Sequence, residues 1–187
     1  DPLQPALSTA NSHVLPFDLK ERRAEPHDIK AASSPLPTAA EDALSTGTDF
    51  VLFSLDPEEQ ENRDESQGFH GWKVLGSTPI QNQGTRTKLL TAFRAGVEEN
   101  DGSVAGCFDP RHGIRVRHDG KTLDFVICFT CYSVARYVDG ERQEAILITD
   151  SPRGVFDDVL KTANVPLPKP SSNWCGFAGH RRRKSPT

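Results

Sequence analysis

The chain has 187 residues, of which 35% are hydrophobic, and its formal net charge at pH 7 is −4. This length allows one domain of ordinary size, or a smaller domain with tails. The negative charge gives the chain as a whole no attraction for nucleic acids or anionic membranes. Its apolar runs are much shorter than the roughly 20 residues that a membrane-spanning helix needs. We therefore expect a domain without a transmembrane segment that does not bind nucleic acid.

Both ends of the chain lack the apolar periodicity of a folded domain. Six of the 14 prolines lie in residues 1–48, among many Ser, Ala and Thr residues, and such a segment buries too little apolar surface to offset its ordering entropy. We expect a disordered arm over residues 1–48, a folded domain over residues 49–168 and a flexible basic tail over residues 169–187. The chain begins at Asp1 and contains no Met, which fits either a cleaved export signal or a fragment boundary.

The first half of the domain is expected to form two strands and a helix. The apolar run over residues 50–55 is typical of a buried strand, and a second strand is expected over residues 72–77. A helix is expected from an N-cap at Thr85 to about Asn100. Its apolar residues recur every four positions and form one stripe: Leu89, Phe93 and Val97.

The second half is expected to form an antiparallel meander and a second helix. The dipeptides at residues 119–120 and 139–140 are both Asp-Gly, a strong signal for a hairpin turn. They separate three expected strands: residues 104–118, 121–138 and 145–149. Ser151 and Pro152 have the residue types of an N-cap and a first helical position. The predicted fold class is α+β, with an antiparallel sheet of about five strands and two helices packed on one face.

The hairpin around residues 119–120 is the segment with the most potential for chemistry. It carries three of the four cysteines and one histidine: Cys107, His112, Cys128 and Cys131. Because side chains alternate along a strand, Cys131 is expected on the apolar face, whereas Cys107 and Cys128 fall on the other face. On a regular strand the Cys-x-x-Cys motif therefore does not place its two sulfurs together.

Three interpretations of these cysteines stay open. In the first, they are buried and unreactive, since free cysteine is among the most buried residue types, and no cofactor is expected. In the second, Cys107 forms a disulfide with Cys128 or Cys131 across adjacent strands, which export would favour. In the third, the three cysteines and His112 bind zinc, which prefers four nitrogen or sulfur ligands.

A functional surface is expected where Pro110 and Gly113 interrupt their strand. Proline lacks the N–H that a strand needs and glycine permits a bend, and bulges occur beside binding sites. Such a distortion would bring a guanidinium, an imidazole and thiols onto one rim: Cys107, Arg111, His112, Cys128 and Cys131. The simpler interpretation is a bulge that only ends strand pairing.

Three segments resemble a family of uncharacterised bacterial proteins of the planctomycete type, which are often exported or lipid-anchored. They are residues 68–76 (GFHGWKVLG), 107–114 (CFDPRHGI) and 126–131 (VICFTC). The resemblance covers about residues 50–168; it implies a bacterial origin and export to the cell envelope or beyond, and it carries over no catalytic residue. We therefore expect an exported binding or structural domain. The alternatives are a thiol- or metal-dependent activity at the cysteine hairpin and a cytoplasmic location.

Overall fold

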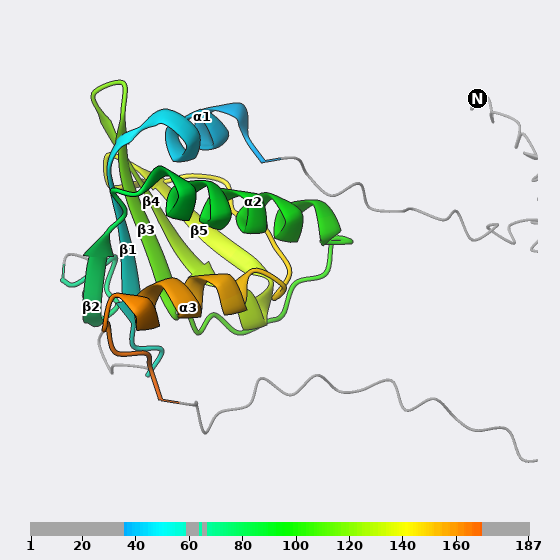
Figure 1. Cartoon of the computed structure of the whole chain (residues 1–187). Coiled ribbons are helices and arrows are strands. Elements are labelled where there is room, and N and C mark those ends of the chain that lie inside the picture. Colours follow the sequence, from blue (N-terminus) through cyan, green and yellow to red (C-terminus); the bar gives the residue numbers. More distant parts are fainter. Residues whose placement is uncertain (1–35, 59–63, 65–66, 170–187) are drawn as a thin grey trace, which may run out of the picture.

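A computed structural model describes residues 36–58, 64 and 67–169. Its strands are β1 Thr48–Leu55, β2 Val74–Pro79, β3 His112–His118, β4 Lys121–Cys128, β5 Ser133–Val138, β6 Glu141–Arg142 and β7 Ile146–Leu147. They form one antiparallel sheet in the order β2-β1-β3-β4-β5-β6, and β7 also pairs with β5. Three helices cover one face of this sheet: α1 Thr38–Thr46, α2 Gln83–Glu99 and α3 Arg153–Thr162 (Figure 1). The α+β class is confirmed, but five strands and two helices are too few.

Helix α1 lies inside the segment that the sequence predicted as a disordered arm, so that prediction is wrong for Thr38–Thr46. Three of its side chains are buried: Ala40, Ala43 and Leu44. Arg86 of α2 holds its end by donating hydrogen bonds to the main-chain oxygens of Ala43, Leu44 and Gly47 at 3.1, 2.8 and 2.6 Å. A helix this short needs such tertiary contacts, and they cannot be predicted from the sequence of α1 itself. Residues 1–35 and 170–187, on which the rest of the arm and tail predictions fall, lie outside the described residues.

The other two helices begin near their predicted positions. The N-cap of α2 is Asn82, whose side chain accepts a hydrogen bond from the Thr85 N–H at 3.0 Å, so Thr85 is inside the helix and not its cap. The predicted apolar stripe of α2 is buried. In α3, Pro152 occupies the capping position without a side-chain hydrogen bond. Phe156 and Leu160 of α3 are fully buried against the sheet.

The register of the central hairpin is as predicted. His118 pairs with Lys121 and the ladder continues to His112 opposite Ile127. The predicted strand over residues 121–138 is wrong, because a 3-10 turn at Phe129–Cys131, followed by Tyr132 in the left-handed region (φ 58°), reverses the chain. Strands β4 and β5 are therefore antiparallel neighbours. Because the apolar run continues into this turn, the spacing of apolar residues does not predict where β4 ends.

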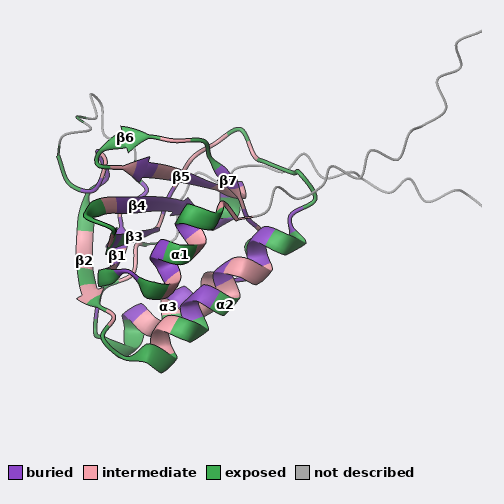
Figure 2. Cartoon of the chain, turned by 90° about the horizontal axis from the view of Figure 1, so that it is seen from above, coloured by how far each residue is buried: buried purple, intermediate pink, exposed green. Residues whose placement is uncertain are grey.

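Both faces of the sheet are packed. On the helix face, the side chains of β1, β3 and β4 meet those of the three helices, and Figure 2 shows buried residues along β4 and β5 and on the helix sides turned to the sheet. The other face, which we call the loop face, is covered by the segment that precedes β2. Its buried residues are Leu55, Phe69, Trp72, Val126, Ala135 and Tyr137. Gly113 admits this segment, since a Cβ there would lie 2.7 Å from the Phe69 ring.

Candidate functional site

Three sulfur atoms meet at the end of β4. Cys128 and Cys131 form a disulfide, and the Cys107 Sγ lies 3.6 Å from the Cys131 Sγ. The main-chain N–H of Asp109 donates to the Cys131 Sγ at 3.3 Å, and the Thr130 hydroxyl lies 3.5 Å from the Cys128 Sγ. Cys128 and Cys131 are fully buried and Cys107 is half-buried. None of the cysteines that the structure describes is a free thiol.

The disulfide joins two residues that the sequence analysis placed on opposite faces. A regular strand would separate their sulfurs, but the 3-10 turn brings the Cα atoms of Cys128 and Cys131 to 5.2 Å. This separation is ordinary for a disulfide. The expected pairing of Cys107 with Cys128 or Cys131 is therefore not the one that forms, and the interpretation of unreactive free thiols does not hold for this pair either.

His112 pairs with Ile127 and lies on the helix face. Cys128 points to the loop face, as Val126 does, because alternate residues of a strand share a face. The His112 Nε2 is 2.9 Å from the Asp157 Oδ1 of α3. Burial lowers the pKa of His112, although the hydrogen bond to Asp157 opposes this, so the ring is neutral at pH 7 and Nε2–H donates to the carboxylate. The pair fixes α3 to the sheet.

Arg111, the residue before β3, forms main-chain hydrogen bonds to both neighbouring strands at the point where a distortion was predicted. Its main-chain oxygen accepts from the Leu55 N–H at 3.0 Å and its N–H donates to the Ile127 oxygen at 3.2 Å, while its side chain donates to the Lys169 oxygen at 3.0 Å. The predicted rim is thus only partly assembled: the cysteines meet, and His112 turns to the other face.

The zinc interpretation finds no support in this arrangement. Among the residues that the structure describes, no group of three or more His, Cys, Asp or Glu side chains is placed to hold a metal ion. Two of the four expected ligands, Cys128 and Cys131, are bonded to each other, whereas zinc binds cysteine as a thiolate.

A polar cluster that was not predicted from the sequence lies on the loop face. The Asp124 carboxylate accepts hydrogen bonds from Arg115 Nε and Nη2 at 2.8 and 2.7 Å and lies 2.7 Å from His70 Nε2. Burial disfavours the charged form of Asp124, but the hydrogen bonds from Arg115 and His70 outweigh it and lower its pKa. The His70 ring stacks on Tyr137 with 3.7 Å between centroids. The cluster therefore fixes the loop segment to the sheet.

One feature of the sequence and one of the backbone point to this cluster once it is known. Asp124 is a single carboxylate between apolar neighbours in β4, and a buried charge requires a partner. His70 stands between Gly68 and Gly71, and all three residues have positive φ. Such a turn holds a side chain in a position that an ordinary loop does not reach.

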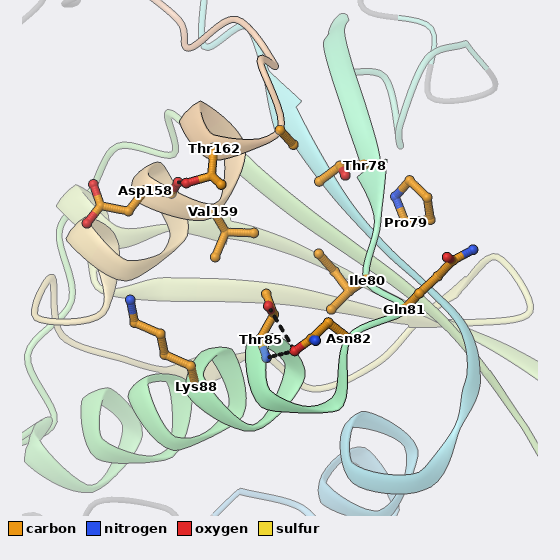
Figure 3. Close-up of a pocket in the computed structure, with 11 residues that line it drawn as sticks. Thr78, Pro79, Ile80, Gln81, Asn82, Thr85, Lys88, Asp158, Val159 and Thr162 are labelled. Atoms are coloured by element: carbon orange, nitrogen blue, oxygen red, sulfur yellow. Dashed lines mark hydrogen bonds between the residues drawn. The ribbon is translucent and has the colours of Figure 1, made fainter.

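A pocket of about 320 Å³ opens between the start of α2 and the end of α3 (Figure 3). Ile80 and Val159 point into it from opposite sides (Figure 3), and they provide an apolar floor. The polar residues of its lining are Thr78, Gln81, Asn82, Thr85, Lys88, Asp158 and Thr162. Neither the histidines nor the cysteines discussed above belong to this lining.

A second hollow, of about 460 Å³, lies where α1 and β1 meet the turn between β3 and β4. Its lining consists of glycines and polar residues: Thr46, Gly47, Thr48, Asp49, Arg117, His118, Asp119 and Gly120. Because ligand pockets are mostly apolar with a few polar groups, the pocket between α2 and α3 is the better candidate despite its smaller volume.

No protein-family model matches the chain, and no curated protein or solved structure is significantly similar to it. The resemblance to planctomycete-type proteins therefore stays a prediction from sequence. In the part of the chain that the structure describes, no helix combines the length and apolar character that crossing a membrane demands.

Proposed function

We propose that this chain is a non-catalytic binding domain of an oxidising compartment outside the cytoplasm, and that its ligand occupies the pocket between α2 and α3. The observation that carries the proposal is the pocket itself. Its volume of about 320 Å³ is within the range of small-molecule sites, and its lining combines apolar side chains, including Ile80 and Val159, with polar ones.

The charges around the pocket favour an anionic ligand. Lys88 is exposed on α2, and its side chain extends along the pocket side of the helix (Figure 3). The Asp158 carboxylate on the opposite helix is 3.6 Å from the Lys161 ammonium, so its charge is partly balanced. The start of α2 adds the positive end of a helix dipole. We therefore expect a small molecule with an apolar body and a carboxylate.

Binding is favoured over catalysis because the reactive side chains lie elsewhere. Proton transfer and nucleophilic attack use His, Cys, Tyr or carboxylates, or a Ser, Thr or Lys that burial or a neighbouring base activates. The described lining contains no His, Cys or Tyr, its one acidic residue is Asp158, and Lys88 is exposed. The disulfide of Cys128 and Cys131 supports an oxidising compartment, because such bonds are rare where the cell keeps thiols reduced.

The test is a ligand-observed NMR screen of aliphatic and aromatic carboxylates against the full chain. Val159→Trp fills the pocket and should abolish binding, whereas Val104→Trp, at a position 59% exposed outside the pocket, should not. Lys88→Gln should weaken carboxylate binding by about two- to fivefold, as expected for an exposed charge contact, and should not affect the corresponding primary amide. Equal binding of the hits to Val159→Trp and to the unmodified chain would refute the proposal.

A further inference from the structure

We propose that Cys107, Cys131 and Cys128 form an internal thiol–disulfide relay, through which an external thiol reduces the buried disulfide. The relay is separate from the pocket between α2 and α3 and does not depend on the binding proposal. It would give the domain a second activity, exchange with low-molecular-weight thiols, or make the state of its buried disulfide responsive to them.

The distance between the sulfurs supports direct exchange. The Cys107 Sγ lies 3.6 Å from the Cys131 Sγ, close to the separation at which reacting atoms attack each other. Thiol–disulfide exchange proceeds by attack of a thiolate on one sulfur of a disulfide. Once the disulfide that holds Cys107 is reduced, its thiolate is placed to attack Cys131 rather than a more distant sulfur.

The surroundings stabilise the thiolates that exchange would produce. The Asp109 N–H points at the Cys131 Sγ from 3.3 Å, and the Thr130 hydroxyl lies 3.5 Å from the Cys128 Sγ. Hydrogen bonds to the charged form of a group favour that form, and a better leaving thiolate speeds exchange. Both sulfurs of the disulfide therefore have a donor in place before the reaction begins.

Solvent access selects Cys107 as the entry point. Cys128 and Cys131 are fully buried, so an external thiol does not reach either sulfur in the folded chain. Cys107 is half-buried beside the exposed Gly106, in the irregular segment between α2 and β3. A small thiol therefore meets Cys107 first.

The steps balance as follows. Cys107 is itself held in a disulfide, and external thiols first reduce that bond, forming their own disulfide and releasing Cys107 as a thiolate. The Cys107 thiolate attacks Cys131: the bond between Cys107 and Cys131 forms, the bond between Cys131 and Cys128 breaks, and Cys128 leaves as a thiolate that takes up a proton. An external thiolate then attacks the Cys107 sulfur and releases Cys131, and a second one frees Cys107. The second stage oxidises two external thiols and reduces one protein disulfide to two thiols.

The experiment uses the full chain with Cys175→Ser, which leaves Cys107, Cys128 and Cys131 as the three sulfurs of the protein. Glutathione is the probe, and reduction of Cys128–Cys131 is followed by alkylation and peptide mass mapping. Adding Cys107→Ser keeps the buried disulfide but removes the relay, so reduction under native conditions should slow by about tenfold or more, since an intramolecular attack is lost. In guanidinium chloride the two proteins should react at equal rates.

A second variant traps the intermediate. With Cys175→Ser and Cys128→Ser, a mixture of reduced and oxidised glutathione should produce a bond between Cys107 and Cys131. Equal native reduction rates with and without Cys107 would overturn the proposal, because reduction would then proceed by opening of the fold. Failure of the trapping variant to form that bond while it retains its native circular dichroism spectrum would overturn it independently.

Discussion

Removing the Asp124 carboxylate should be one of the most costly single changes in this domain. The side chain of Asp124 is 4% exposed and that of its partner His70 is 13% exposed, so the contact between them keeps the strength of a hydrogen bond to a buried charge, about 1.5–3 kcal/mol. Arg115 is 45% exposed and regains water when its partner is lost, which limits its share to about 0.5–1 kcal/mol. Asp124→Ala should therefore destabilise the fold by about 2–4 kcal/mol.

Urea denaturation followed by tryptophan fluorescence measures this loss, because Trp72 lies buried in the same loop segment. For a domain of this size the change corresponds to a fall in Tm of roughly 10 °C. Asp158→Ala is the control, since that carboxylate is exposed and, among the described residues, forms an ion pair with Lys161 alone; it should cost less than about 0.5 kcal/mol. In a double-mutant cycle, His70→Ala and Asp124→Ala should couple by about 1–2 kcal/mol. A loss no larger than that of Asp158→Ala, or additive effects in the cycle, would refute the reasoning.

Four further substitutions test other parts of the fold. Burial lowers the pKa of His112 in the folded chain. As the pH falls, His112 of the unfolded chain is therefore protonated first, near the ordinary pKa of about 6.5. The free energy of unfolding should be unaffected by His112 above this pH and should decline below it. His112→Gln keeps a donor for Asp157 and should reduce the change of the urea midpoint between pH 7 and pH 5. The same pH dependence in this variant and in the unmodified chain would contradict a neutral buried ring. Gly47→Ala places a Cβ 2.5 Å from Val116 Cγ2 and 2.6 Å from two main-chain oxygens, and should cost about 1–3 kcal/mol. Gly154→Ala, in α3 with open space around it, should instead stabilise by about 0.5–1 kcal/mol; thermal melts of both that shift in the same direction would be inconsistent with this packing. Leu44→Ala should cost about 2–5 kcal/mol by urea denaturation, and a cost below 1 kcal/mol would mean that α1 does not belong to the core.

Local signals in the sequence were sufficient for the central hairpin and the two longer helices. The Asp-Gly turn at residues 119–120 fixes the register of β3 and β4, because a two-residue turn leaves one way to pair the strands. The stripe through Leu89, Phe93 and Val97 identifies the buried side of α2 in the same way. Both features depend on residues close together in the chain.

Features that depend on distant residues were not predictable from local signals. Helix α1 is held by Arg86, about 40 positions further along the chain, and nothing near α1 indicates this contact. The reversal at Tyr132 occurs in a residue type that rarely adopts positive φ, inside an apolar run that reads as one strand. That reversal creates the disulfide, so the pairing of the cysteines could not be derived without it. His70 and Asp124 are 54 positions apart and meet only through the sheet topology.

The claim that the pocket between α2 and α3 is the ligand site is tested most directly by amide chemical-shift mapping on the ¹⁵N-labelled full chain. Carboxylates from the screen are titrated into the protein and the shifting amides are assigned. We expect the largest shifts within residues 78–88 and 158–163, which include the residues that line the pocket, and we expect these shifts to disappear in Val159→Trp. Shifts centred on the loop face or the sulfur cluster, or no carboxylate that binds more tightly than millimolar, would contradict the account.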